Sequence, residues 1–435
     1  MNITELSVSE LAENLRQRNI SAVEATRACL ERISATAELN NFITVCEESA
    51  LADAELSDET LVNRAAPSVL CGVPVAVKDN IYTAGVKTTC ASRVMFDFVP
   101  SKNSAVVNKL KAAGAVVLGK TNMDEFAMGS TNENSAFGAV KNALNPTRVA
   151  GGSSGGSANS VAAKQAFCAL GSDTGGSARQ PAAYCGVVGL KPTLGAVERD
   201  GLIGFAPSLD CVGLLARDCF GAAALFDVVS KHGISDKFRR DGFTGDLRGV
   251  TIGVADEFLS SPYLDGQVAE TFMRAQCVLA DAGAKIERVT LPSFFAGIAA
   301  YHIISSAEAA RSFKNCEYIS DRTELLGAEV KRRILTGEYV SSGARYDELY
   351  IKAARVRSVI KSEYCAALEK CDVLLCPTAP NIAPLIGEKI PPDVSHYNDM
   401  YAAPVSLAGL PAVSVPFGTA HGMPVGMQII GRYNA

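Results

Sequence analysis

The first sixty residues carry apolar positions at helical spacing, and the pattern changes to short apolar runs further along the chain. Ser-x-x-Glu capping boxes at residues 7–10 and 21–24 predict the starts of two helices. A polar stretch at 55–66 follows. The run GVPVAV at 72–77 is typical of a buried strand, because it is short, continuously apolar and rich in valine. We therefore expect an N-terminal helical part followed by buried strands.

Strand-like runs alternate with helical segments over the rest of the chain. A helix predicted over 104–113 ends at Gly114 and leads into a strand at 115–118, and the same order recurs over 267–289. Further runs typical of buried strands lie at 250–255, 372–376, 412–417 and 425–430. Strands rich in Val and Ile between helices predict an α/β fold with a mostly parallel mixed β-sheet that helices cover on both faces.

No linker or internal repeat divides the chain, so a single large domain over residues 1–435 is expected, with the helices of residues 1–60 packed on it. The 48% hydrophobic and 20% charged composition excludes a mainly disordered protein. A net charge of −5 provides no overall basic field for nucleic acid or a membrane surface. The apolar runs are shorter than the ~18 residues that a membrane helix needs, so no membrane association is expected.

The cysteines and histidines of the chain do not have the sequence spacing that is typical of a metal site. The 13 cysteines include no CxxC pair, and the chain has only four histidines. We therefore expect no metal site, and we interpret the cysteines as buried free thiols of a protein in the reducing cytoplasm.

A segment rich in glycine and serine differs from the rest of the chain. Residues 151–157 read GGSSGGS and residues 173–177 read DTGGS. A flexible linker is disfavoured because helix-forming sequence flanks the first stretch. The phosphate-loop pattern GxxxxGK[ST] does not fit it and matches instead at 114–121, where AVVL is strand-forming and uses its N–H groups in a ladder. A serine nucleophile is the remaining interpretation.

A serine nucleophile needs a base to remove its proton. None of the four histidines lies in a motif-like segment, and His302, on an apolar helix, is interpreted as a packed core residue. The other candidate base is a lysine kept neutral by burial. Lys78 stands at the end of the 72–77 run, but most lysines at strand ends reach solvent, so position alone leaves its role open.

These segments resemble the amidase signature family. A Gly/Ser stretch, a GGS nucleophile and a GLKPT run occur in the family's order over 151–193, and the family's upstream lysine matches GVPVAVKDN at 72–80. The resemblance implies the amidase signature fold and Ser-Ser-Lys chemistry, with Ser177 as nucleophile and Ser153 linking it to the base Lys78. It also implies an oxyanion hole made by the backbone N–H groups of Thr174, Gly175, Gly176 and Ser177.

Within that family, the chain is most similar to a subfamily, the A subunits of the aspartyl/glutamyl-tRNA amidotransferases. The stretches that carry this similarity are 120–138, 201–213, 327–339 and 407–418. The similarity implies glutamine as the amide substrate. It assigns Arg357 and Asp399 to the charged groups of glutamine and Gly129 and Ser130 to the lining of the pocket.

The same similarity implies a glutaminase subunit that supplies ammonia to a partner B subunit, with a small C subunit completing a heterotrimer. The B subunit would use ATP and Mg²⁺ to amidate Glu-tRNA(Gln) or Asp-tRNA(Asn) and would hold most of the tRNA, so no cofactor is expected in this chain. A stand-alone amidase for another carboxamide and a non-catalytic assembly scaffold are the alternatives. The sequence departs from the family pattern at three places. His302 stands where relatives show a second Tyr, the region 313–326 is shorter than in relatives, and the terminal helical segment of relatives is expected to be missing here.

Overall fold

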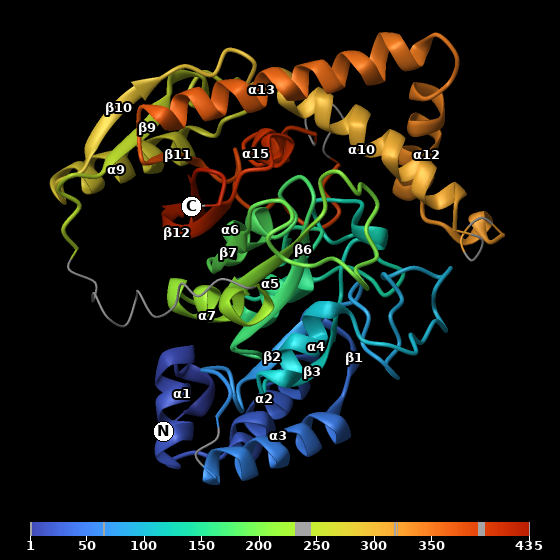
Figure 1. The fold of residues 1–435 in the computed structure, drawn as a ribbon, viewed down its shortest axis with the longest axis vertical. Helices are drawn as coiled ribbons and strands as arrows, with labels where there is room; N and C mark the ends of the chain where they lie inside the picture. Colours follow the sequence, from blue (N-terminus) through green and yellow to red (C-terminus); the bar gives the residue numbers. More distant parts are fainter. Residues whose placement is uncertain are drawn as a thin grey trace.

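The computed structural model describes residues 2–63, 66–230, 245–316, 319, 321–389 and 396–434, and a single mixed sheet of eleven strands runs through them (Figure 1). The strands of this sheet, in spatial order, are β1 (Phe42–Val45), β3 (Val116–Thr121), β2 (Pro74–Lys78), β6 (Cys168–Asp173), β8 (Cys211–Ala216), β7 (Val188–Lys191), β12 (Ala412–Ala420), β13 (Met423–Ile430), β11 (Val373–Pro377), β9 (Thr251–Ala255) and β10 (Lys285–Val289). A separate small hairpin joins β4 (Lys141–Asn142) to β5 (Asn145–Val149).

Helices cover both faces of the sheet, as the alternating pattern predicts. The described helices are α1 (Val8–Gln17), α2 (Ala22–Ala35), α3 (Glu47–Val62), α4 (Ala105–Ala112), α5 (Gly155–Ala162), α6 (Arg179–Cys185), α7 (Cys219–Val229), α9 (Gly266–Asp281), α10 (Ala296–Lys314), α12 (Ala328–Val340), α13 (Lys352–Glu369) and α15 (Ala403–Ala408). None of the helices within the described ranges is long and apolar enough to cross a membrane.

The α/β class and the mixed sheet are confirmed, while the strand directions differ in detail from a mostly parallel arrangement. Parallel pairing joins β3, β2 and β6 on one side and β11, β9 and β10 on the other. The strands between them, from β6 through β8, β7, β12 and β13 to β11, pair antiparallel. The runs at 412–417 and 425–430, which the sequence indicates as buried strands, therefore belong to antiparallel strands, because an apolar run does not show the direction of its strand.

The predicted helix starts agree with the structure. The Ser7 hydroxyl accepts the Glu10 backbone N–H at 3.1 Å, and the Glu10 carboxylate accepts the Ser7 N–H at 2.7 Å, which completes the first capping box. The second box joins Ser21 and Glu24 in the same way. These bonds satisfy N–H groups that the first turn of a helix otherwise leaves unpaired, so each helix begins at a fixed residue.

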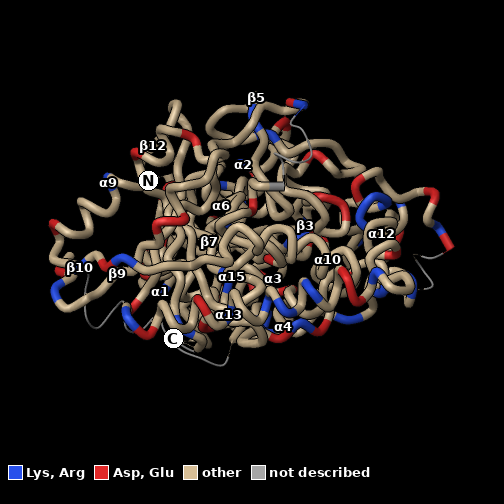
Figure 2. Tube along the Cα trace, turned by 90° about the horizontal axis from the view of Figure 1, so that it is seen from above, with Lys and Arg blue, Asp and Glu red and all other residues tan. Residues whose placement is uncertain are grey.

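Two large apolar clusters fill the space between the sheet and its helices. One cluster joins the N-terminal helices to the parallel strands, with Leu11, Leu15 and Ile33 packed together with Val75 and Val117. The other lies around α9, α10, α13 and α15. Charged residues of both signs are interspersed along the chain in the view of Figure 2, rather than gathered on one basic face.

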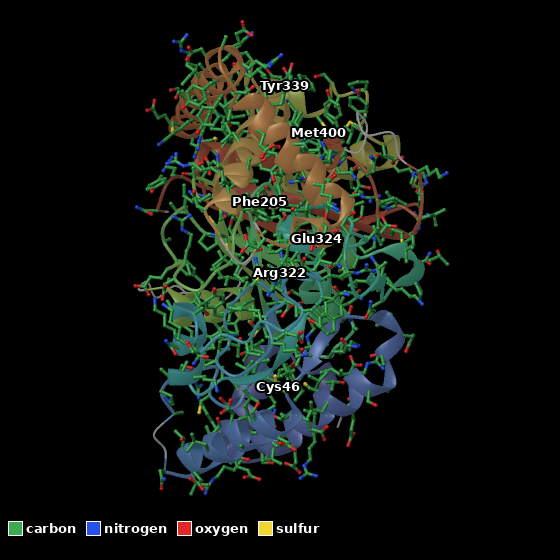
Figure 3. The ribbon with its side chains drawn as sticks, turned by 90° about the vertical axis from the view of Figure 1, so that its right-hand side faces the viewer. Cys46, Phe205, Arg322, Glu324, Tyr339 and Met400 are labelled. Atoms are coloured by element: carbon green, nitrogen blue, oxygen red, sulfur yellow. The ribbon has the colours of Figure 1, made fainter. Side chains whose placement is uncertain are left out.

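Figure 3 shows the N-terminal helices at one end of the molecule and the half that contains α10 and α12 at the other. Phe205 and Met400, both of the second cluster, lie in the half that contains α10 and α12, whereas Cys46 lies beside the N-terminal helices. The Gly/Ser segment of the chain forms α5, β6 and α6 between these halves (Figure 1). The core therefore supports the Gly/Ser segment from both sides.

Candidate active site

Lys78 is the last residue of β2 and is fully buried. Its Nζ lies 2.8 Å from the Oγ atoms of Ser153, Ser154 and Ser172. Ser172 comes from β6, which pairs parallel with β2, so the ends of the two strands meet at one edge of the sheet. Ser153 and Ser154 come from the loop that leads into α5. The fold thus directs the lysine into a cluster of hydroxyls rather than into solvent.

Burial lowers the pKa of Lys78 to about 7, although the carboxylates of Asp124 and Asp173 act in the opposite direction. A substantial fraction of this amine is therefore uncharged near neutral pH and can accept a proton. The Ser154 hydroxyl donates to the Ser172 carbonyl at 2.9 Å, so toward Lys78 it can act only as an acceptor. Ser153 keeps its own proton available for the amine.

Ser177 lies in the turn between β6 and α6, which we call the TGGS turn (residues 174–177). Its carbonyl accepts the Ser154 N–H at 3.0 Å, so the turn lies beside the loop that carries Ser153. Within the described chain, the N–H groups of Gly175, Gly176 and Ser177 donate to no other residue. Three free N–H groups next to a serine are suited to stabilise an oxyanion.

The two glycines of the TGGS turn have no room for a side chain. A Cβ at Gly175 would lie 2.4 Å from a ring carbon of Tyr301, and one at Gly176 would lie 2.7 Å from the Cβ of Ala402. Gly176 also has φ +143°, a conformation that side chains rarely adopt. Close packing on both sides therefore requires glycine and fixes the direction of the free N–H groups.

A cavity of about 300 Å³ lies beside this turn and is lined by Gly129, Ser130, His302, Arg333 and Asp399, among others. Within the part of the chain that the structure describes, the Asp399 Oδ1 is buried and has no hydrogen-bond partner. This atom would lie 3.2 Å from a Cβ on Gly176, so it faces the TGGS turn. Burial raises the pKa of Asp399 to about 7, and the Arg333 guanidinium opposes that rise. The cavity therefore presents an acidic and a basic side chain beside the turn.

Comparison with known proteins gives the family. The model of the amidase family matches residues 24–435. The A subunit of glutamyl-tRNA(Gln) amidotransferase from Caldanaerobacter subterraneus subsp. tengcongensis is 44% identical over 460 residues, which cover 100% of this chain and 94% of that protein. The chain belongs to the amidase family. It is an enzyme of the amidase class, and the resemblance inferred from its motifs is confirmed.

Solved structures of other amidases share its fold. The crystal structure of the glutamyl-tRNA(Gln) amidotransferase A subunit from Thermotoga maritima has a TM-score of 0.81 at 37% identity and covers 99% of this chain and 91% of that chain. The peptide amidase from Stenotrophomonas maltophilia has a TM-score of 0.81 at 28% identity, with 98% and 93% of the two chains covered. The fold is thus common to amidases whose names indicate different substrates.

Arg357 does not line the cavity of this amidase, in contrast to the sequence-based expectation. Its guanidinium donates to the Oγ and the carbonyl of Ser208, both at 2.8 Å, and to the Leu407 carbonyl at 3.0 Å. The arginine beside Asp399 is Arg333 of α12, which is buried and donates to Glu329 at 2.7 Å. Charge type alone cannot show which helix faces the cavity. The signal for Arg333 is the paired arginines in GAEVKRRILTGEY, within one of the subfamily stretches.

His302 also differs from its expected place in the core. It lies on α10 and lines the cavity, and it is only half-buried, whereas its neighbour Tyr301 is buried against Gly175. The helix is apolar over most of its length because one face packs on the core, but position 302 falls on the face toward the cavity. The residue that departs from the family pattern is therefore close to the candidate substrate site.

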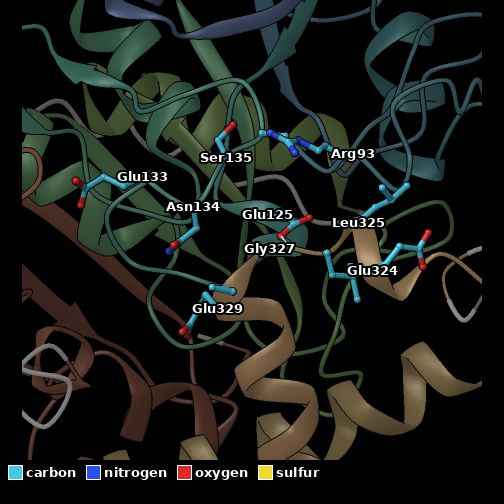
Figure 4. A pocket seen from close by; sticks show the side chains of 12 residues that line it. Arg93, Glu125, Glu133, Asn134, Ser135, Glu324, Leu325, Gly327 and Glu329 are labelled. Atoms are coloured by element: carbon cyan, nitrogen blue, oxygen red, sulfur yellow. Dashed lines mark hydrogen bonds between the residues drawn. The ribbon is translucent and has the colours of Figure 1, made fainter.

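A second cavity of about 370 Å³ adjoins the first and shares Glu133, Asn134 and Glu329 with it. Figure 4 shows Glu133, Glu329, Glu125 and Glu324 around this cavity, with Arg93 above Glu125 and Leu325 in the view. Glu125 is tied into the wall, since its carboxylate accepts the Ser92 hydroxyl at 2.5 Å and the Gly327 N–H at 2.8 Å. A wall this acidic is unfavourable for an anionic ligand.

The lysine of the phosphate-loop match is held inside the protein. Lys120 belongs to β3 and is fully buried, and its Nζ donates to the Ile81 carbonyl at 2.8 Å and to the Thr88 hydroxyl at 2.7 Å. The carboxylate of Asp79 lies 3.5 Å from the same nitrogen. Val116, Val117 and Leu118 of the preceding AVVL run are in the strand, close to what the sequence predicts. This match therefore offers neither a loop nor a free lysine for phosphate.

Proposed function

We propose that this amidase is the glutamine-hydrolysing subunit of a tRNA-dependent amidotransferase and that it releases ammonia through an acyl-Ser177 intermediate. The observation that carries the chemistry is the buried contact of 2.8 Å between Lys78 Nζ and Ser153 Oγ, beside the TGGS turn. Support for the substrate and the complex comes from the relatives named as A subunits of glutamyl-tRNA(Gln) amidotransferase, at 37–44% identity over nearly the whole chain.

The first half of the reaction forms the acyl-enzyme. Ser177 Oγ attacks the amide carbon of the substrate, and its proton passes to Ser153 Oγ while the Ser153 proton passes to the neutral Lys78 amine. Negative charge develops on the amide oxygen, and the N–H groups of the TGGS turn stabilise it, at about 3–4 kcal/mol for one donor. When the C–N bond breaks, the Lys78 proton returns through Ser153 to the nitrogen, and ammonia leaves.

The second half releases glutamate. A water molecule gives a proton through Ser153 to Lys78, and its oxygen attacks the ester carbon of acyl-Ser177. The same N–H groups stabilise the resulting oxyanion. The ester C–O bond then breaks, and Ser177 recovers its proton from Lys78. Each proton that Lys78 accepts is returned within the same half-reaction. Every step of this chemistry is performed by Lys78, Ser153 and the TGGS turn, so the proposal calls for no cofactor in this chain.

The cavity supports a free amino acid as substrate. The unpartnered Asp399 carboxylate is placed to bind the α-ammonium of glutamine, and the Arg333 guanidinium its α-carboxylate. Gly129 and Ser130 line the same cavity and would border the side chain. A stand-alone amidase for an uncharged carboxamide would gain nothing from this pair of charges. The arrangement therefore favours glutamine over that alternative.

The remaining parts of the proposal concern the complex. A B subunit would accept the ammonia and use ATP and Mg²⁺ to amidate Glu-tRNA(Gln) or Asp-tRNA(Asn), and a small C subunit would join the pair. The net charge of −5 supports binding of the tRNA mainly by the partner. This function would place the chain in the cytoplasm, where aminoacylated tRNA is used.

We also propose that residues 1–435 form one amidase domain, to which the helices of residues 1–60 belong. Their apolar side chains share a cluster with β2 and β3, which supports this extent. The family match, over residues 24–435, includes α3 and most of α2 as well as the catalytic strands.

The function is tested by comparing glutamine with propionamide as substrates of the purified chain, with and without the partner subunits. We expect glutamine to be the better substrate, with ammonia and glutamate formed in equal amounts. Mass spectrometry of acid-quenched enzyme should show a glutamyl adduct on the peptide that contains Ser177. Faster cleavage of propionamide would support a stand-alone amidase, and absence of turnover even with the partners would support the scaffold alternative.

Arg333→Met is expected to raise the KM for glutamine about 10–100-fold, with a smaller effect on kcat, because one charge-assisted contact with the substrate is lost. Steady-state kinetics over a range of glutamine concentrations checks this. Arg357→Met is the matched comparison, since Arg357 lies outside the cavity, and it should leave the KM unchanged. A raised KM for Arg357→Met together with an unchanged KM for Arg333→Met would instead support Arg357 as the arginine that binds the substrate.

A further inference from the structure

Thr174 and Asp210 stand opposite each other just beyond the end of a strand pair. Strands β6 and β8 are antiparallel, and Asp173 pairs with Cys211 in their ladder. The next residue of each strand is therefore Thr174 on one side and Asp210 on the other. The Thr174 hydroxyl donates to Asp210 Oδ1 at 2.6 Å, so a side-chain hydrogen bond continues the ladder where the backbone pairing ends. Thr174 is the first residue of the TGGS turn.

The Asp210 carboxylate is itself held in place. Its Oδ2 accepts the Ala206 N–H at 3.0 Å, and the Asp210 N–H donates back to the Ala206 carbonyl at 2.9 Å. These bonds close a tight turn over 206–210, which we call the Asp210 turn. A Cβ on Gly204 would lie 2.0 Å from Asp210 Oδ2, so the chain leading into the turn packs directly on the carboxylate. Asp210 is buried, and its two oxygens are fixed in direction.

Three charged side chains from other parts of the chain form hydrogen bonds with the Asp210 turn. Arg357 of α13 donates to both the Oγ and the carbonyl of Ser208 at 2.8 Å. Glu308 of α10 accepts the Ser208 N–H at 2.8 Å. Arg199 donates to the Asp210 carbonyl at 3.2 Å. All the polar groups of Ser208 are thus used by residues of two helices, and the turn cannot shift without breaking charge-assisted bonds.

We propose that Asp210 is a positioning residue for the oxyanion site: it fixes the TGGS turn through the Thr174 hydroxyl, and Arg357 fixes Asp210 through Ser208. This deepens the proposed function, on which it rests for the identity of the substrate. The free N–H groups of Gly175, Gly176 and Ser177 follow Thr174 directly, so their direction depends on where Thr174 is held. This proposal gives the subfamily stretch 201–213 a role in positioning the oxyanion site. It gives the same role to Arg357, which does not reach the cavity.

Thr174→Val tests the proposal, because valine has nearly the shape of threonine and lacks the hydroxyl. We expect kcat for glutamine to fall about 10–100-fold, since a small misplacement of oxyanion donors is costly, while the KM stays within about twofold. Thr174→Ser, which keeps a hydroxyl, should restore most of kcat. Thr271→Val is the matched control, since Thr271 is also buried and hydrogen-bonded but lies on α9, and it should keep wild-type kinetics.

A second readout separates positioning from loss of folded protein. The boronic acid analogue of glutamine, in which B(OH)₂ replaces the carboxamide, adds the Ser177 oxygen to boron while the Ser177 proton passes to the Ser153–Lys78 pair. An oxygen of this tetrahedral adduct occupies the oxyanion site, whereas glutamate binds without forming the adduct. Thr174→Val should weaken binding of the boronic acid analogue by about the factor lost in kcat and leave glutamate binding unchanged. Arg357→Met should show the same selectivity with a smaller loss. Equal losses for both ligands, or a kcat within twofold of wild type in Thr174→Val, would overturn the proposal.

The failure of the proposed function would be recognised separately. If wild-type enzyme cleaves propionamide and not glutamine, the substrate assignment is wrong, and the kcat comparison of the Thr174 variants is then made with propionamide. A fall in kcat restored by Thr174→Ser would still support the positioning role, because every amide passes through an oxyanion. No difference between Thr174→Val and wild type with either amide would reject it.

Discussion

Ser177→Ala is expected to abolish glutamine hydrolysis, with a fall in kcat of about 10⁴-fold or more, while the protein stays folded. The alanine keeps the backbone of the TGGS turn and removes the only atom that the proposed mechanism uses to attack the amide carbon. The free N–H groups of the turn remain, so glutamine should bind with a KM or Kd close to that of the wild type. Ammonia release measures the loss, and calorimetric binding of glutamine measures the retained affinity.

Ser160→Ala is the matched control for this variant. Ser160 is buried on α5 and donates to the Ser157 carbonyl at 2.9 Å, but it does not contact Lys78. It should keep activity close to that of the wild type. If Ser177→Ala retained a substantial fraction of the wild-type rate, Ser177 would not be the nucleophile, and a glutamyl adduct would have to be sought on Ser153 or Ser154.

Lys78→Met is expected to lower kcat about 10³–10⁴-fold, because methionine has a similar length and no group that accepts a proton. Lys191→Met provides a comparison, since Lys191 is also buried, its pKa is also lowered by burial, and its Nζ donates to the Pro192 carbonyl outside the cavity. Circular dichroism and thermal unfolding should show that both variants fold. Equal activity of the two variants would contradict the role of Lys78 as base.

The role of Lys78 as base also predicts how kcat changes with pH. With the pKa of Lys78 at about 7, the reactive neutral amine is lost as pH falls through that value, so kcat should be about 100-fold lower at pH 5 than on the alkaline plateau. The measurement is made on kcat, because protonation of Asp399, whose pKa is also near 7, would weaken glutamine binding and raise the KM instead. A kcat independent of pH between 5 and 9 would exclude a neutral lysine base.

Much of this architecture could be predicted from the sequence because local rules decide it. Ser7 and Ser21 cap helices through their own neighbours, and the apolar run before Lys78 has one reasonable structure, a buried strand. Strands such as β6, with sequence CALGSD, were not predicted, because its first residues continue the helix-forming sequence after the Gly/Ser stretch and its last residues are typical of loops. Their strand conformation depends on pairing with distant β2 and β8, which no local pattern reveals.

The residues of the candidate site that belong to a sequence motif could be predicted. The residues that come close only through the packing of distant segments could not. Lys78 and Ser153 are in contact as the motif implies, but nothing in the sequence indicated that Ser172 also lies against the lysine. Arg357 and Arg333 have the same charge on neighbouring helices, and only tertiary packing decides which of them reaches Asp399. Local sequence therefore located the groups that are proposed to react more reliably than the groups that are proposed to hold the substrate.

The lone Asp399 oxygen has a thermodynamic consequence for the resting enzyme. A desolvated carboxylate oxygen without a donor destabilises the ligand-free fold. An arriving ammonium group would remove that penalty as it binds. Saturating glutamine should accordingly raise the melting temperature of Ser177→Ala. In the absence of any amino acid, Asp399→Asn should have a higher melting temperature than the enzyme with Asp399, although it would bind the α-ammonium of glutamine less well.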